Sequence, residues 1–124
     1  EVSRGNSRLD FRLTQGDRVC WVEVKSVTYV RDGVGLFPDA PTGRGRRHLD
    51  ELAHLVASGN KASAVFIAQR GDAVRFAPYE AIDPVFAETI RQVHRQGVDI
   101  HAYRCNVGVD KIEIADEIPV EIYY

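Results

Sequence analysis

Residues 8–28 read RLDFRLTQGDRVCWVEVKSVT, and this stretch predicts the start of a β-sheet. Polar and apolar side chains alternate over residues 8–13, and residues 19–28 are rich in β-branched and aromatic side chains, which is typical of strands. Residues 15–18 (QGDR) between them have the composition of a turn. The pattern therefore predicts a β-hairpin in which Thr14 faces Val19.

This hairpin would set three charged side chains on one face. With Thr14 opposite Val19, Asp10 lies directly across from Glu23, and the two-residue period of a strand puts Lys25 beside Glu23. Opposed carboxylates, about 4.5–5.5 Å apart at Cβ, destabilise a sheet unless a cation neutralises them. Carboxylate oxygens suit Mg²⁺, and a neighbouring ammonium can orient a water or stabilise charge on phosphorus. The residues favour metal-dependent phosphodiester hydrolysis.

The Glu-x-Lys spacing is weak as a signal on its own. With three lysines and eight glutamates in 124 residues, it arises by chance roughly 0.2 times per chain. An exposed ladder of paired charges is the alternative interpretation. The hairpin register favours the catalytic interpretation over the exposed ladder, because it places Asp10 on the same face as Glu23 and Lys25.

The rest of the chain alternates helices and strands. Residues 30–45 hold several glycines and two prolines and predict an irregular loop that can include short extended pieces. The pattern becomes helical from His48, with an apolar stripe of Leu49, Leu52, Ala53 and Val56, and ends near Gly59. Asp83 followed by Pro84 is a typical helix start, with Gly97 at the end. Further strands are expected at Ala64–Gln69, covered on both faces, and at Val98–Arg104, Lys111–Ala115 and Val120–Tyr123. This order predicts an α/β fold with a mixed β-sheet flanked by helices.

Composition restricts the class of protein. A chain of 124 residues and 13.9 kDa, 44% hydrophobic and 27% charged, is one globular domain. The longest uncharged apolar runs are far shorter than the roughly 20 residues that cross a bilayer, so we expect no membrane partner. The two cysteines, Cys20 and Cys105, have no metal or redox spacing and predict reduced thiols in a cytoplasmic protein.

The charge distribution does not by itself indicate a nucleic-acid partner. The formal net charge is −2, with 14 Lys+Arg against 12 Asp+Glu in residues 1–98 and 2 against 6 in residues 99–124. A prediction of nucleic-acid binding must therefore rest on local clusters of basic residues. The strongest is Arg44-Gly45-Arg46-Arg47-His48, at the start of the first helix, where positive charge is unfavourable by about 0.3–1 kcal/mol per group unless an anion binds.

We interpret this cluster as a phosphate-binding segment, with Thr42 and Gly45 allowing close backbone approach. Arg8 adds positive charge near Asp10. A solvated basic loop is the alternative. Gln69, at the end of a central strand, is an accessory candidate with a plain hydrogen-bonding role as its alternative. Trp21 either stacks on a base or packs in the core, and the spacing of the four histidines does not suit a zinc site.

Several strings resemble the sugar fermentation stimulation protein A family over nearly the whole chain. They are NSRLDF (6–11), VEVKSVT (22–28), FPDAPTGRGRRHLDEL (37–52), FIAQR (66–70), IDP (82–84) and GVDIHAY (97–103). The resemblance implies a restriction-endonuclease-like core of the PD-(D/E)XK type, in which Asp10, Glu23 and Lys25 match the motif. It also implies that residues 1–124 form one nuclease-like domain and lack the OB-like domain that precedes it in the family.

Taken together, the residues and the resemblance predict a DNA or RNA nuclease dependent on Mg²⁺ or Mn²⁺. Asp10 and Glu23 would bind the metal with the Val24 carbonyl, and the resemblance adds Glu1; Lys25 would position the water. The alternative is a non-catalytic DNA-binding or regulatory domain linked to sugar (maltose) metabolism. A third hypothesis is an assembly module whose C-terminal strand, PVEIYY (119–124), pairs with a partner; monomer and homodimer both remain open.

Overall fold

The computed structural model describes residues 2–4, 7–9 and 11–123. A five-stranded sheet has the order β10-β9-β7-β4-β3. Three parallel strands form its centre, β4 (Arg18–Val27), β7 (Lys61–Ala68) and β9 (Asp99–Val107), and an antiparallel strand closes each edge, β3 (Phe11–Gln15) and β10 (Ile112–Ile118). The predicted mixed α/β fold is confirmed.

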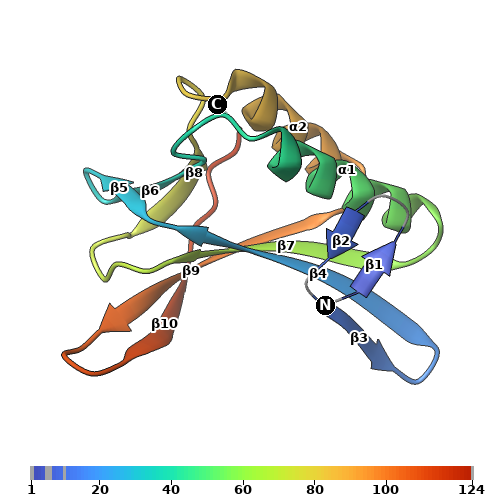
Figure 1. The fold of residues 1–124 in the computed structure, drawn as a ribbon, viewed down its shortest axis with the longest axis horizontal. Coiled ribbons are helices and arrows are strands. Elements are labelled where there is room, and N and C mark those ends of the chain that lie inside the picture. Colours follow the sequence, from blue (N-terminus) through green and yellow to red (C-terminus); the bar gives the residue numbers. More distant parts are fainter. Residues whose placement is uncertain (1, 5–6, 10, 124) are drawn as a thin grey trace.

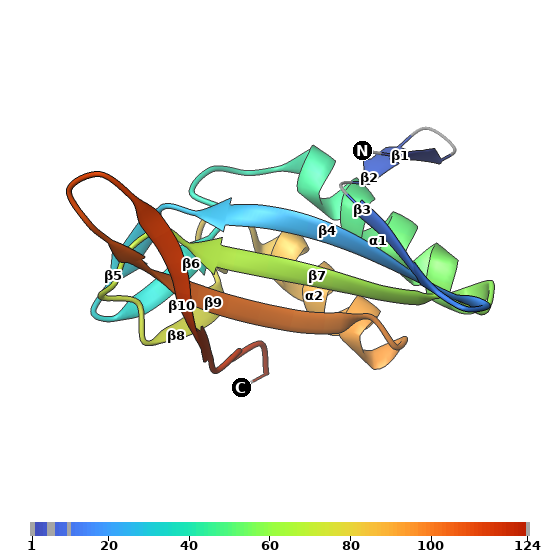
Figure 2. The same cartoon turned by 90° about the horizontal axis from the view of Figure 1, so that it is seen from below.

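Two helices cover one side of this sheet (Figure 1). Helix α1 (Gly43–Ala57) and helix α2 (Pro84–Arg95) pack on each other and on the covered face, and from below the strands lie in front of both (Figure 2). The prediction for α2 is confirmed, with Asp83 at the N-cap. Helix α1 begins five residues before the predicted His48, because the Thr42 hydroxyl caps it by accepting a hydrogen bond from the Gly45 backbone N–H.

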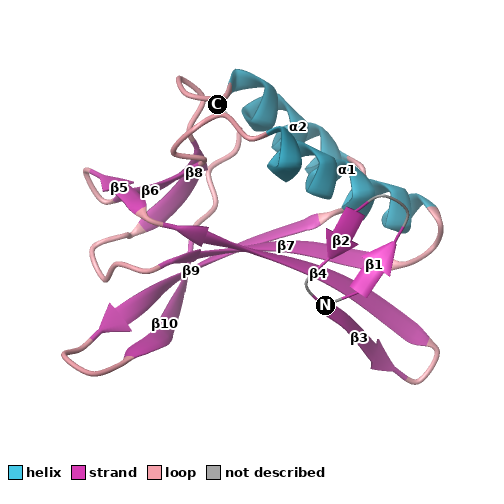
Figure 3. Ribbon diagram, viewed as in Figure 1, coloured by secondary structure: helices cyan, strands magenta, loops and turns pink. Residues whose placement is uncertain are grey.

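A second sheet of three short strands lies beside the first (Figure 3). It has the order β5 (Tyr29–Arg31), β6 (Val34–Phe37) and β8 (Arg75–Pro78). The short extended pieces predicted within the loop over residues 30–45 correspond to β5 and β6, and Asp32 and Gly33, which both have positive φ, turn the chain between them into a hairpin. Strands β1 (Val2–Arg4) and β2 (Ser7–Leu9) form a separate pair.

The core lies between the helices and the covered face of the five-stranded sheet. Its members come from every helix and from the central strands, and the largest fully buried side chains include Leu52, Leu55, Phe66, Phe76, Phe86 and Ile90. The ring of Phe66 contacts the rings of Phe76 and Phe86, with 4.4 Å between the centroids of Phe66 and Phe76. Trp21 is buried in this core, which favours the packing interpretation over base stacking.

Strand β7 alternates between buried and half-buried residues, so its predicted coverage on both faces is wrong. No described helix covers the open face of the sheet, which carries Val24, Val65 and Ile67. Towards the two hairpins this face becomes strongly exposed, at 57% for Leu13 and 60% for Ile114. Because only one face of the sheet is buried, the open face is accessible as a contact surface.

The C-terminal segment is not a strand, contrary to the prediction for Val120–Tyr123. It forms a single bridge, between Phe76 and Val120, and it follows β8 through two backbone hydrogen bonds. The Phe76 N–H donates to the Pro119 carbonyl at 2.9 Å, and the Glu121 N–H donates to the Phe76 carbonyl at 2.8 Å. This segment thus packs against its own chain along β8, and its pairing with a partner stays a prediction.

Candidate functional site

The hairpin of β3 and β4 has the predicted register. Thr14 pairs with Val19, and Gln15 pairs with Arg18 across a two-residue turn in which Gly16 has a φ of 62°. Glycine is preferred at the first position of such a turn because it reaches positive φ without strain. Asp10, predicted opposite Glu23, lies outside the described residues, as does the proposed ligand Glu1.

Glu23 and Lys25 lie on the covered face of β4, at its carboxyl-terminal half. The strand alternates, so that Trp21, Glu23 and Val27 point to the helices while Val22 and Val24 point to the open face. Glu23 is only 2% exposed, and its Oε2 lies 4.0 Å from Lys25 Nζ. A carboxylate this deeply buried requires polar neighbours, since an unpaired buried charge is very costly.

Helix α1 supplies one of these neighbours, His48. Its Nδ1 lies 2.7 Å from Glu23 Oε2 and 2.8 Å from Lys25 Nζ. His48 is 5% exposed and shares the buried stripe of α1 with Leu52 and Leu55, four and seven residues later. That position on the stripe is the sequence signal for burial against the sheet. From the sequence, His48 was grouped with the neighbouring arginines, and its contact with Glu23 and Lys25 was not predicted.

The arginines lie in the first turns of α1, just before His48. Arg44 and Arg47 are exposed and Arg46 is half-buried. The guanidinium groups of Arg46 and Arg47 fold over Gly43, within 3.6 and 3.5 Å of the position that a Cβ would occupy there. Arg46 Nε is buried and makes no hydrogen bond within the part of the chain that the structure describes. Arg8 lies on β2, and its side chain is outside the part of the chain whose side chains the structure describes.

The loop before α1 is tied to the start of α2. One oxygen of the Asp83 carboxylate accepts a hydrogen bond from the Phe86 N–H at 3.0 Å, and the other accepts one from the Thr42 N–H at 2.8 Å. Gly45 is buried, and a Cβ there would lie 2.8 Å from the Thr42 side chain. Gly45 thus serves close packing and its N–H serves the cap, which differs from the predicted role in ligand approach.

Gln69 follows β7 at the edge where β4 also ends. Its side-chain Nε2 donates to Ser26 Oγ at 3.2 Å, and its backbone N–H donates to the Val27 carbonyl at 3.1 Å. Gln69 therefore links the ends of the two parallel strands. Its exposed side chain lies beside Ser26, one position beyond the β4–β7 pairing.

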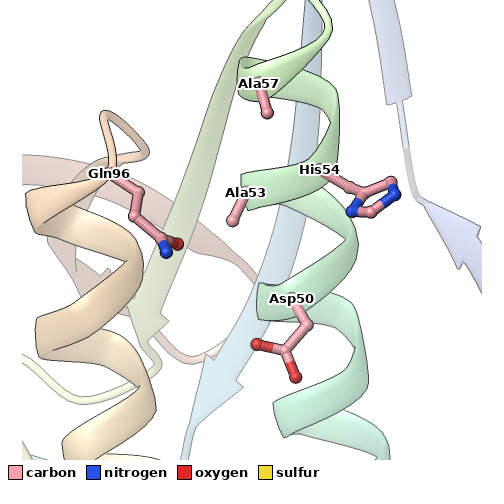
Figure 4. A pocket seen from close by; sticks show the side chains of 5 residues that line it. All are labelled: Asp50, Ala53, His54, Ala57 and Gln96. Carbon is pink, nitrogen blue, oxygen red and sulfur yellow. The ribbon is translucent and has the colours of Figure 1, made fainter.

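A surface pocket between the helices does not belong to this site (Figure 4). Its lining contains none of the site residues predicted from the sequence. The lining residues come from the middle and end of α1 and from the residue after α2, and they are Asp50, Ala53, His54, Ala57 and Gln96. The polar cluster on β4 and α1 is thus separate from this pocket.

The described residues supply few metal ligands. Within residues 2–4, 7–9 and 11–123, no three His, Cys, Asp or Glu side chains are grouped as a metal site. The oxygens at hand are the Glu23 carboxylate and the Val24 carbonyl, which are hard donors of the kind that Mg²⁺ binds while it keeps several waters. The two cysteines are free thiols, as predicted, and no described helix is long and apolar enough to cross a membrane.

The chain is similar to proteins of known families. Residues 1–111 match the model of the "Sugar fermentation stimulation protein RE domain". A sugar fermentation stimulation protein homolog of Moorella thermoacetica is 54% identical over 124 residues, which cover 98% of this chain and 53% of that protein. The homolog of Chloroflexus aurantiacus is 47% identical over 120 residues, which cover 97% of this chain and 46% of that protein.

A solved structure has the same fold. The structure of Pyrococcus furiosus SfsA in complex with Ca²⁺ superposes with a TM-score of 0.92 at 33% identity, covering 98% of this chain and 53% of that one. The chain spans about half the length of the relatives it matches. By sequence and by structure, the chain belongs to the sugar fermentation stimulation protein (SfsA) family.

Proposed function

We propose that this chain is a metal-dependent nuclease domain that hydrolyses phosphodiester bonds in DNA or RNA, on a restriction-endonuclease-like core. The observation that carries the proposal is the buried Glu23 carboxylate, 4.0 Å from the Lys25 ammonium, beneath a helix that begins with three arginines. A carboxylate and an ammonium held together beside an anion-attracting surface are the groups that phosphodiester hydrolysis needs. The Ca²⁺ bound by the Pyrococcus furiosus relative supports a divalent cation in the family.

Each residue has a distinct part in this mechanism. The Glu23 carboxylate and the Val24 carbonyl would hold Mg²⁺ or Mn²⁺, joined by Asp10 and Glu1 from the sequence prediction. When bound, the ion supplies Lewis-acid stabilisation to the phosphate oxygens. Lys25 orients the attacking water and stabilises the negative charge that develops around phosphorus.

The arginines hold the substrate backbone. Arg44 and Arg47 present exposed guanidinium groups at the N-terminus of α1, where phosphate is favoured both by charge and by the helix dipole. Arg46, whose Nε is buried, can reach a phosphate only with its outer nitrogens. Gln69 stays a candidate for contact with the substrate at the strand ends.

The proposal is tested by cleavage assays with labelled single- and double-stranded DNA and RNA, in Mg²⁺, Mn²⁺ or EDTA. Glu23→Gln and Lys25→Met should each reduce cleavage by about 10²-fold or more while nucleic-acid binding persists. Glu113→Gln and Lys111→Met are matched controls, because this exposed pair lies on the β9–β10 hairpin and changes the same charges. Full activity in Glu23→Gln would overturn the proposal.

Binding is measured separately, as a function of salt. Charge reversal of Arg44 and Arg47 should weaken binding and make its salt dependence shallower, because fewer counterions are released. Salt-sensitive binding without cleavage in any metal would replace the nuclease proposal by the alternative, a non-catalytic DNA-binding domain linked to regulation of sugar (maltose) metabolism.

A further inference from the structure

We propose that two stacked tyrosines, Tyr29 and Tyr79, form a platform on which an unpaired base of a single-stranded nucleic acid stacks. The inference deepens the proposed function and rests on it for nucleic acid as the substrate. It adds a substrate class, since groups that bind phosphate serve single and double strands alike. It begins from one contact: the two rings are parallel within 2°, with 5.5 Å between their centroids.

The three-stranded sheet places both rings on its outer face. The buried residues that face the core form one row across β5, β6 and β8, namely Val30, Gly35 and Phe76. Side chains alternate along a strand, so the adjacent row of Tyr29, Leu36 and Ala77 faces away from the core. Tyr79 comes two positions after Ala77, and its stacking on Tyr29 places it on the same face.

One side of the tyrosine pair is open to solvent. Tyr29 is 36% exposed and belongs to β5, which is an edge strand of the described sheet. Its ring has one face against Tyr79, which comes from the β8 side, so the other face is turned towards the open edge. A base that stacks there would extend the pair to three rings, and such stacking on aromatic side chains is how proteins bind single strands.

The platform lies at the end of the molecule where the proposed site lies. In Figure 1 and Figure 2 the three-stranded sheet continues from the arrowhead of β4, near the start of α1. Strand β6 packs on the ends of β4 and β7, because a Cβ at Gly35 would lie 3.4 Å from Val27 and 3.8 Å from Ala68. Tyr29 follows Lys25 by four residues, so their Cα atoms are at most about 14 Å apart. A strand with a phosphate at Lys25 reaches Tyr29 within a few nucleotides, since each spans about 3.4 Å even in a duplex.

Tyr79 is linked through packed side chains to the basic start of α1. Its backbone N–H donates a hydrogen bond to the Phe37 carbonyl at 2.8 Å. The ring of Phe37 packs on that of Phe86, with 5.3 Å between centroids, and a Cβ at Gly45 would lie 3.4 Å from the Phe86 ring. The core thus holds the platform and the arginines of α1 in one arrangement.

Positive charge accompanies the rings on the outer face. Arg31 is exposed and comes two positions after Tyr29 on β5, so it shares this face. Arg75 lies in the same row as Arg31 but is paired with Glu121, at 3.2 Å between Nε and Oε1. Arg31 is therefore the cation that we expect to contact a phosphate next to the stacked base.

Access to the platform selects an unpaired base. Bases inside a duplex are stacked on both sides, whereas the bases of single strands, loops and ends present their faces to a protein. Trp21, the other aromatic residue for which the sequence left base stacking open, is buried in the core. The exposed ring of Tyr29 takes that role in this proposal.

The direct test measures binding of single-stranded oligonucleotides to the unmodified chain in EDTA, so that metal-dependent cleavage does not interfere. One oligonucleotide carries normal bases, and the other has the same length and charge but contains abasic sites. We expect the first to bind about tenfold more tightly or better, the size of effect that stacking of one base on an aromatic side chain gives. Equal affinities, or no binding of either oligonucleotide, would overturn the inference.

Substitutions assign this preference to the platform. Tyr29→Leu removes the ring and should abolish most of the preference for normal over abasic DNA, whereas Tyr29→Phe should retain it. A merely structural role of Tyr29 would instead change the affinity for both oligonucleotides by the same factor. Tyr103→Leu is the matched control, because Tyr103 is a half-buried tyrosine on β9, outside the three-stranded sheet. A folded Tyr29→Leu that keeps the full preference would overturn the inference.

The outcomes separate this inference from the proposed function. A preference for normal bases that is lost in Tyr29→Leu, without any cleavage in Mg²⁺ or Mn²⁺, would support the platform and remove the nuclease. Cleavage that depends on Glu23, with equal affinity for the normal and abasic oligonucleotides, would keep the nuclease and remove the platform.

Discussion

Two histidine–carboxylate pairs lie on opposite faces of the five-stranded sheet. On the covered face, His48 Nδ1 lies 2.7 Å from Glu23 Oε2, with side-chain exposures of 6% and 3%. On the open face, His101 Nδ1 lies 3.0 Å from Glu117 Oε2, with exposures of 42% and 56%. The same two chemical groups thus meet at nearly the same distance in very different surroundings.

The difference teaches that distance alone does not identify a site. Water and salt screen the exposed pair, so it contributes little to stability and constrains neither side chain. The buried pair cannot be relaxed by solvent, and it lies beside Lys25 under a helix that begins with arginines. We therefore expect function to depend on the covered face, and the open face to tolerate substitution.

The largest loss of stability should come from a substitution on the covered face of β7, compared with one at the adjacent residue on the open face. Phe66 is fully buried against Phe76 and Phe86, and Ile67 is half-buried on the open face. Phe66→Ala should lower the free energy of unfolding by about 3–5 kcal/mol, because it leaves a cavity in the core. Urea denaturation measures it, and Ile67→Ala, with a smaller loss, is the matched control. Equal losses would contradict the difference between the faces.

The next largest loss of stability should follow removal of the Asp83 carboxylate, which caps α2 and binds the N-cap residue of α1. Asp83→Ala removes acceptors for the Phe86 and Thr42 N–H groups. The free energy of unfolding should fall by about 1–3 kcal/mol, as measured by thermal and urea denaturation. Asp50→Ala, at an exposed position of α1, should change it by no more than about 0.5 kcal/mol. A similar loss in both variants would show that the cap is not responsible.

Two glycines at the start of α1 should respond with opposite signs. A Cβ at Gly45 would lie 2.8 Å from the Thr42 side chain, so Gly45→Ala should cost about 1–2 kcal/mol. At Gly43 a Cβ would meet only the flexible ends of two arginines at 3.5 Å or more, and alanine favours the helix by up to about 1 kcal/mol. Denaturant titration of both variants checks this, and a stabilised Gly45→Ala would exclude the packing explanation.

The smallest energy should be the coupling between His101 and Glu117, the exposed pair on the open face. A double-mutant cycle with His101→Ala and Glu117→Ala should give a coupling energy below about 1 kcal/mol, which decreases further as salt is added. Urea denaturation at low and high salt measures it. A larger, salt-independent coupling would remove the contrast with the buried pair of His48 and Glu23.

Much of the site could be predicted because its geometry is local. The register of the hairpin follows from a short turn, and the two-residue period of β4 puts Glu23 and Lys25 on one face. The contact of His48 with Glu23 was not predictable in this way, since it joins residues 25 positions apart through the packing of a helix on a strand. A buried histidine on an apolar stripe is a visible signal, but the sequence does not name its partner.

The fold was predictable where a periodic pattern of apolar side chains runs over many residues. Helix α2 and the central strands follow from clear patterns and caps. The four-residue strand β8 was missed, because a piece this short that ends in proline shows too little alternation. Coverage of both faces was expected for β7 because its apolar run is continuous, although its open-face positions are half-exposed.

The shared carboxylate of Asp83 also affects local opening of the chain. The amide hydrogens of Thr42 and Phe86, 44 positions apart, depend on the two oxygens of one side chain. A fluctuation that swings this carboxylate away exposes both amides at the same moment, and rotation of a single bond can break both contacts. The starts of the two helices are therefore coupled through Asp83, and local opening at this side chain deprotects both amides together.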